Sequence, residues 1–131
     1  MLINLSNHPY DKWPEDQKSA AIELYHNVTD IPFPNIDPWL TTSEVDELTE
    51  QYLDLISAYD DVTVHIMGEL VFTFLMVDRL REVGIPCIAS TTERLVEVEG
   101  ETKRVTFQFC QFRPYFIESD PPHISRFDFI T

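Results

Sequence analysis

Residues 62–84 constrain the fold of this chain more than any other segment, and they read VTVHIMGELVFTFLMVDRLREVG. Val62–Met67 is short, β-branched and apolar, which is typical of a strand buried on both faces. Gly68 permits a sharp turn, and Glu69–Val83 then carries apolar side chains on nearly every side. We therefore predict a strand, a tight turn and a helix that a sheet or a second subunit encloses, with Gly84 as its C-cap.

Strands alternate with helices along the rest of the chain. Apolar runs predict further strands at Leu2–Ser6, Val28–Phe33 and Ile85–Ser90. Pro32 makes the second of these short or places it at a sheet edge, because proline cannot donate to a ladder of hydrogen bonds.

Two more helices are predicted before the central strand. One begins near Pro14, and its inner face carries Ala21, Leu24 and Tyr25. The other opens with Thr41–Glu44, which has the composition of a capping box. Apolar residues follow at alternating spacings of three and four and form one amphipathic stripe: Val45, Leu48, Tyr52, Leu55 and Tyr59.

A hairpin is predicted near the C-terminus. The polar run 91–94 reads as a break after the fourth strand, and Leu95–Val98 and Val105–Phe109 then alternate apolar and polar residues. The order of elements indicates an α/β protein with a mostly parallel sheet and a C-terminal antiparallel β-hairpin. We assign residues 1–117 to one domain, and residues 118–131 to a C-terminal arm that packs late or crosses to a partner.

The charge of the chain restricts its partners. It carries 23 acidic and 9 basic residues, a formal net charge of −14. Duplex DNA and anionic membranes would be repelled, whereas a local site for a small anion stays open. The N-terminus lacks the pattern of a signal peptide, and the apolar run in Leu70–Val77 is too short to span a bilayer, so we expect a cytoplasmic protein. Cys87 and Cys110 lie in apolar runs, which favours two buried free thiols over a disulfide.

Three polar corners follow predicted parallel strands, where open α/β sheets bind ligands. Because the carboxyl ends of parallel strands lie at one edge, we expect the corners to converge around an anion at a helix N-terminus. The corner residues are Ser6, Asn7 and His8; His65, Gly68 and Glu69; and Ser90, Thr91, Thr92, Glu93 and Arg94.

Each candidate has a structural alternative. His8 either has a functional role or only bonds the backbone in the turn before Pro9, and His65 is either functional or a buried structural histidine. Glu69 either contacts ligand or complements the helix dipole. Arg94 beside three hydroxyls indicates an anion site.

Two further readings involve neighbouring residues. Trp13 stacks on a nucleobase or forms a hydrophobic staple for the first helix. His8, His65, Glu69 and Glu93 have the chemistry of manganese or zinc ligands, but their spacings match no known metal motif, so no metal ligand is assigned.

The layout resembles the CRISPR-associated Rossmann-like (CARF) fold over about residues 2–112, and INLSNHP looks like the start of small stand-alone CRISPR-associated proteins of type III systems. The third-strand corner departs from the glycine pair with hydroxyls usual in that family, because it reads Met67-Gly68-Glu69. The resemblance implies a Rossmann-like three-layer fold and a homodimer that binds cyclic oligoadenylate.

The resemblance also implies an activity. Related ring nucleases cleave cyclic oligoadenylate, commonly without a metal or other cofactor, by aligning a ribose 2′-hydroxyl with the adjacent phosphate. His8 or His65 would move the proton, and Arg94 with helix N-terminal amides would hold the phosphate. Two alternatives stay open: a sensor or sponge that binds the ligand without cutting it, and a small acidic α/β protein-interaction module.

Overall fold

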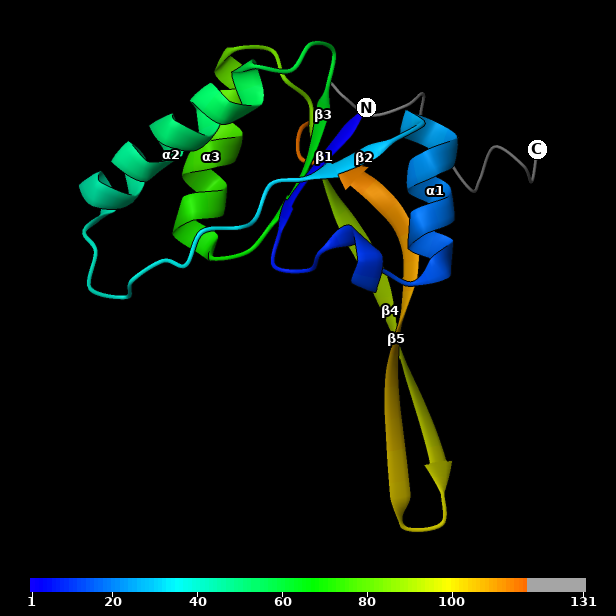
Figure 1. The fold of residues 1–131 in the computed structure, drawn as a ribbon. Helices are drawn as coiled ribbons and strands as arrows, with labels where there is room; N and C mark the ends of the chain where they lie inside the picture. The colour runs from blue at the N-terminus through cyan, green and yellow to red at the C-terminus, as the bar shows by residue number, and fades with distance from the viewer. Residues whose placement is uncertain (118–131) are drawn as a thin grey trace, which may run out of the picture.

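The computed structural model describes residues 1–117, which form an α/β fold around a mixed sheet with strand order β2-β1-β3-β4-β5 (Figure 1). The first four strands are parallel and β5 is antiparallel to β4, as predicted. The strands are β1 (Leu2–Ser6), β2 (Val28–Asp30), β3 (Thr63–Met67), β4 (Cys87–Glu99) and β5 (Thr102–Pro114). The helices are the 3-10 turn η1 (Tyr10–Lys12), α1 (Glu15–Tyr25), α2 (Thr42–Ser57) and α3 (Leu70–Glu82).

Helices cover both faces of the sheet (Figure 1). The larger core lies under α2 and α3, where Ile3 and Leu5 of β1 meet Val64 and Ile66 of β3. The alternate residues of the same two strands face α1, because successive side chains of a strand point to opposite sides. These alternate residues include polar ones, so the α1 face of the sheet combines a small apolar cluster with buried polar groups.

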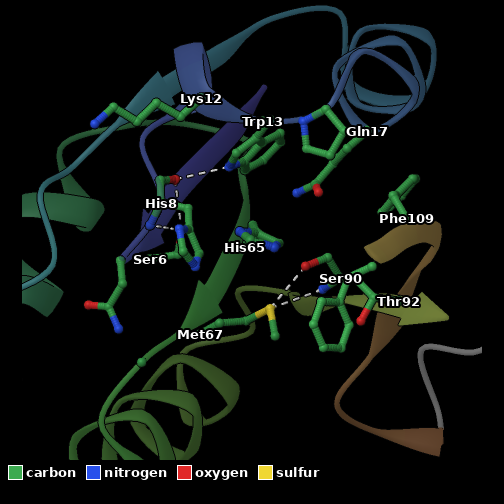
Figure 2. A pocket seen from close by; sticks show the side chains of 14 residues that line it. Ser6, His8, Lys12, Trp13, Gln17, His65, Met67, Ser90, Thr92 and Phe109 are labelled. Atoms are coloured by element: carbon green, nitrogen blue, oxygen red, sulfur yellow. Dashed lines mark hydrogen bonds between the residues drawn. The ribbon is translucent and has the colours of Figure 1, made fainter. Parts of the chain in front are cut away.

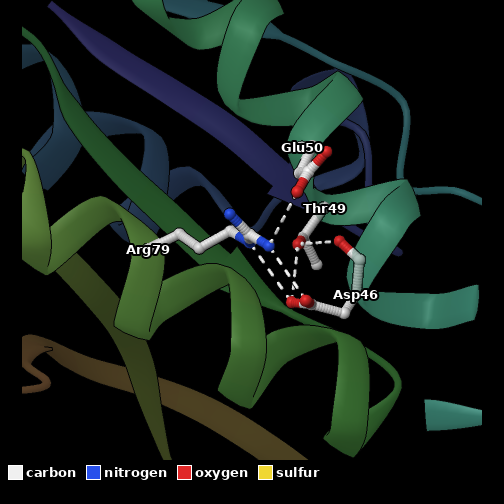
Figure 3. Close-up of polar contacts among 4 residues, drawn as sticks. All are labelled: Asp46, Thr49, Glu50 and Arg79. Atoms are coloured by element: carbon white, nitrogen blue, oxygen red, sulfur yellow. Dashed lines mark hydrogen bonds and ion pairs between the residues drawn. The ribbon is translucent and has the colours of Figure 1, made fainter. Parts of the chain in front are cut away.

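Helix α2 begins with the predicted capping box: the Thr41 hydroxyl accepts from the Glu44 amide, and the Glu44 carboxylate accepts from the Thr41 amide. A fork of ion pairs joins α2 to α3, since Arg79 donates to Asp46 at 2.9 Å and to Glu50 at 3.2 Å (Figure 3). These ion pairs are partly exposed, so each contributes at most about 1 kcal/mol to stability.

The predicted inner faces of two helices are wrong in part, because Leu24, Leu55 and Tyr59 are exposed. In α2 both Thr49 and Ile56 are fully buried. Ile56 stands about 20° around the helix from Val45, whereas Leu55 stands about 80° away on the other side. Residues repeated every 3.5 positions therefore move gradually away from the buried face of a straight helix, which has about 3.6 residues per turn.

The predicted break at residues 91–94 is also wrong. The fourth strand and the first strand of the hairpin are one element, β4, which pairs with β5 along almost its whole length. Both strands are 13 residues long, so the hairpin projects well beyond the sheet (Figure 1). Polar residues remain in the strand there because neither face of the projecting hairpin packs against a core. For the same reason Cys110 is exposed, contrary to the prediction, although Cys87 is buried and both thiols are free.

A β-bulge at the base of the hairpin redirects its aromatic side chains. Ser90 pairs with Phe112 and Thr92 pairs with Phe109, so one residue of β4 opposes two of β5. The extra residue shifts the alternation of β5 by one position. Phe109 and Phe112 consequently face the same side, with ring centroids 5.0 Å apart.

Helix α3 is buried on one side only. Phe72, Met76 and Leu80 lie in the core, whereas Leu70 is 84% exposed and Phe74 is 71% exposed. Among residues 1–117, no helix has the length and hydrophobicity needed to cross a membrane. The predicted C-terminal arm, residues 118–131, lies outside the described residues.

Candidate functional site

Asn4 lies at the centre of a polar network on the α1 face, near the carboxyl ends of the central strands. Its Nδ2 donates to the His8 carbonyl at 2.8 Å and to Asp30 Oδ1 at 2.9 Å. Its Oδ1 lies 2.7 Å from Ser6 Oγ and 3.0 Å from His65 Nδ1. The Asn4 side chain therefore makes all four hydrogen bonds that an amide of this kind offers.

This network determines the tautomer of His65. Because the Asp30 carboxylate and the His8 carbonyl are acceptors, the Asn4 amide must direct its NH₂ group toward them and its oxygen toward His65. His65 Nδ1 must then carry the proton and donate it to that oxygen. The other ring nitrogen, Nε2, is left with a free lone pair.

His65 Nε2 is buried and has no hydrogen-bond partner among residues 1–117. The His65 side chain is 2% exposed, and Trp13 packs edge-on against it with ring centroids 4.9 Å apart. Burial, with a smaller effect from His8, lowers the pKa of His65 from 6.5 to about 4. The imidazole is therefore neutral near pH 7, and Nε2 is a hydrogen-bond acceptor.

A cavity of about 370 Å³ opens beside this nitrogen (Figure 2). The volume is within the range of small-molecule sites. Its walls come from the ends of β1, β3 and β4, from the segment before α1, and from the base of the hairpin. The lining residues are Ser6, Asn7, His8, Lys12, Trp13, Pro14, Gln17, His65, Met67, Gly68, Ser90, Thr92, Phe107 and Phe109.

The charge of the lining differs from that of the chain. It contains Lys12 and no aspartate or glutamate, although the whole protein has a formal charge of −14. The hydroxyls of Ser6, Ser90 and Thr92 add polar groups to the wall. An anion in the cavity therefore meets a cation and hydroxyls, and no carboxylate of the lining repels it.

His8 fixes the turn before Pro9 through its main chain and also contributes its side chain to the cavity wall. Its carbonyl accepts from Asn4 Nδ2 and from Trp13 Nε1, at 2.8 and 2.9 Å, which fixes the turn before Pro9. Its side chain is exposed at the cavity wall, close to Ser6 in Figure 2. Trp13 is buried beneath the turn, so it serves as a wall of the cavity and part of the α1-side core.

Most residues of the predicted corners converge, and four do not. One of the four is Glu93, whose side chain lies on the opposite side of β4 from Thr92. The lining includes Ser6, Asn7, His8, His65, Gly68, Ser90 and Thr92. Glu69 instead caps α3, because its carboxylate accepts from the amides of Val71 and Phe72. Thr91 points away and bonds the main chain of Gln111 across the hairpin. Arg94 lies farther out on β4, opposite Phe107.

Sequence reasoning missed other members of the site. Lys12 and Gln17 enter it from η1 and α1, and Phe107 and Phe109 enter it from β5. Asn4 had a signal, since an amide in the middle of a buried strand requires partners. Within residues 1–117, no group of three or more histidine, cysteine or acidic side chains is arranged to hold a metal ion.

A comparison with protein families places the chain in one of them. The family model described as "Uncharacterized protein MJ1673 family" matches residues 1–113, so the chain belongs to this family. The matched range contains every residue of the cavity and of the Asn4 network. Searches of curated proteins and of solved structures gave no match.

Proposed function

We propose that this member of the MJ1673 family binds cyclic oligoadenylate in the cavity and cleaves it, as a cytoplasmic ring nuclease of type III CRISPR signalling with a Rossmann-like three-layer fold. The observation that carries the proposal is the free acceptor Nε2 of His65 beside a cavity that lacks carboxylates. A ribose supplies the hydroxyl donor that this nitrogen needs, and a phosphate matches Lys12.

The chemistry needs no metal. The 2′-hydroxyl donates its hydrogen bond to His65 Nε2 and attacks the adjacent phosphorus as its proton moves to that nitrogen. A 2′,3′-cyclic phosphate forms, the bond from phosphorus to the 5′-oxygen breaks, and protonated His8 gives a proton to the leaving oxygen. Lys12 supports the charge on the phosphate. Solvent then reprotonates His8, whose side chain is exposed, and His65 loses its added proton once the product has left the cavity.

The low pKa of His65 affects this reaction in two ways. It keeps Nε2 unprotonated at neutral pH, but a group with a pKa of about 4 is a weak base. Cleavage should therefore be slow, and alignment of the 2′-hydroxyl should supply much of the rate. The same observation favours the second candidate function, a sensor or sponge that holds the ligand without cutting it.

A symmetric ring of nucleotides is larger than one cavity of about 370 Å³. The proposal therefore includes a homodimer, in which each subunit binds part of the ring. The exposed apolar side of α3, with Leu70 and Phe74, supports an additional contact of this kind.

The direct test is to incubate the protein with cyclic tri-, tetra- and hexa-adenylate, with and without a chelator, and to measure binding and products separately. We expect one ring to bind and to give linear products ending in a 2′,3′-cyclic phosphate, with no effect of the chelator. His65→Phe, which lacks the acceptor, should slow cleavage by about a hundredfold or more.

Two lysine variants provide a matched comparison. Lys12→Ala should weaken ring binding, whereas Lys18→Ala, an α1 cation outside the cavity lining, should bind as the parent does. Binding without products in the parent would assign the protein to the sensor or sponge class. A parent that binds none of the three rings would overturn the proposal.

A further inference from the structure

The two sides of the projecting hairpin differ in charge. Thr92 and Phe109 line the cavity and pair across the strands, so they define the cavity side of the hairpin. Side chains two residues farther along each strand share that side. The pairs that follow outward are Arg94 with Phe107, Val96 with Val105, and Val98 with Lys103. This side therefore has two cations and no carboxylate.

The opposite side carries the acidic residues of the hairpin. Glu93, Glu97 and Glu99 lie there on β4, with Arg104 across from Glu97. The acidic side chains of the two hairpin strands are thus confined to one side, although the whole chain has a formal charge of −14. The cavity side of the hairpin therefore resembles the cavity lining, because both contain cations and lack carboxylates.

Arg94 and Phe107 are the first pair beyond the cavity rim. Phe107 lines the cavity and is nevertheless 64% exposed, so much of its ring is uncovered. Arg94 is exposed directly opposite and forms no ion pair within residues 1–117. Proteins bind single-stranded nucleic acids with such pairs of side chains. A base stacks on the exposed aromatic ring, and a phosphate contacts the guanidinium that has no ion-pair partner.

We propose that Arg94 and Phe107 form a second subsite, which binds the nucleotide that follows the one held in the cavity. This inference rests on the proposed nucleotide binding and adds the recognition of a longer oligonucleotide. The base stacks on Phe107, and the phosphate that links the two nucleotides contacts Arg94. Phe107 is two strand residues, about 7 Å, from Phe109. That separation is comparable to the phosphate spacing of an extended nucleotide chain.

The test compares AMP with linear di-, tri- and tetra-adenylate, each titrated into the full chain by calorimetry. In the parent, lengthening AMP to the dinucleotide should raise affinity by about tenfold to a hundredfold, since base stacking on an aromatic residue has this effect. Arg94→Ala and Phe107→Ala should each remove most of that gain. For a dinucleotide that lacks its second base, affinity should be unaffected by Phe107→Ala and should still be weakened by Arg94→Ala.

Arg104→Ala and Leu95→Ala are matched controls on the opposite side of the hairpin, and both should keep the gain of the parent. If the parent binds the cyclic rings but no linear adenylate of any length, the inference is overturned and the proposed function stands. If it binds neither the linear adenylates nor the rings, both are overturned. If the parent binds AMP but gains nothing with length, or if the Arg94 and Phe107 variants keep the gain, the inference is overturned and nucleotide binding stands. The inference also fails if Arg94→Ala alters self-association and leaves the gain unchanged, because a second copy would then occupy this surface.

Discussion

The side-chain amide of Asn4 holds the imidazole of His65 in one tautomer, with Nδ1 3.0 Å from Asn4 Oδ1 and Nε2 unpartnered beside the cavity. The orientation of the amide comes from Asp30, 26 residues away in the sequence, whose carboxylate accepts from Asn4 Nδ2. A carboxylate on the edge strand β2 thus determines which ring nitrogen of a histidine on β3 carries the proton. This relation turns a buried histidine into a selective acceptor for a hydroxyl or amino group.

Replacing the amide of Asn4 by a carboxylate should change the titration of His65. In Asn4→Asp, a negative charge would lie beside Nδ1 and favour the imidazolium, so the pKa of His65 should rise from about 4. Nitrogen NMR should show a single neutral tautomer, protonated at Nδ1, in the parent near pH 7. An unchanged pKa of His65 in the variant would contradict the assigned network.

His65 should make the protein less stable in mild acid. Its pKa is about 4 in the folded state, against the ordinary histidine value of 6.5 in an unfolded chain, so the unfolded chain binds the proton more tightly. Stability from this group is fully present above pH 6.5 and is lost as the pH falls toward 4. The loss should reach roughly 3 kcal/mol, from 1.36 kcal/mol per pKa unit.

The measurement is chemical denaturation of the parent and of His65→Phe between pH 7 and pH 4.5, with His26→Asn as a second histidine control. Carboxylates titrate in all three proteins, so the difference between curves isolates His65. The His65→Phe curve should be flatter than the other two, and parallel curves for all three would count against the depressed pKa.

Local signals in the sequence predicted much of the fold. Period-2 and period-3.6 patterns, the capping box at Thr41 and the glycine after Val83 place the helices and strands along the chain. The topology alone then places Ser6, His65 and Ser90 at one edge, because parallel strands end together. These residues do line the cavity.

The errors arose where the outcome depends on tertiary contacts. The run around Arg94 was taken as a break because polar residues usually leave a sheet, yet in a projecting hairpin both faces are exposed and the strand continues. The misplacement of Arg94 relative to the cavity follows from that error. The Asn4–Asp30 contact depends on the pairing of β1 with β2, which no local pattern specifies.

Glu69 should matter for stability and little for ligand binding. Its carboxylate accepts from the amides of Val71 and Phe72, at 3.1 and 2.7 Å, and it does not line the cavity. Glu69→Ala should cost about 1 kcal/mol of unfolding free energy, as the loss of an N-cap does. Affinity for cyclic oligoadenylate should stay at the parent value, and a large loss of affinity without loss of stability would restore Glu69 to the site.

Gly68 is required by a close approach, not by a positive φ angle. An added Cβ would lie 2.2 Å from the ring of Phe33, which packs on Phe72 and the main core. Gly68→Ala should therefore displace the Phe33 ring and lower stability by about 1–3 kcal/mol, the cost of overpacking. In a Phe33→Leu background, Gly68→Ala should lower stability by less than it does in the parent. Equal costs in the two backgrounds would contradict the proposed clash.

The exposed side of α3 should hold two copies of the chain together. Leu70 and Phe74 line a largely apolar groove of about 430 Å³ together with Tyr115 and Phe116. A contiguous apolar surface of this kind is uncommon on a monomer, and a symmetric pair would bury it twice.

Sedimentation of the full chain at micromolar concentration should show a dimer, and the double variant Leu70→Ser/Phe74→Ser should shift it toward monomer. Leu24→Ser is the matched control, because Leu24 is 61% exposed on α1, away from the groove. Far-ultraviolet circular dichroism should be unchanged in both variants, since all three side chains are largely exposed. A monomeric parent would remove the α3 dimer, and with it the argument that one ring is shared between two cavities.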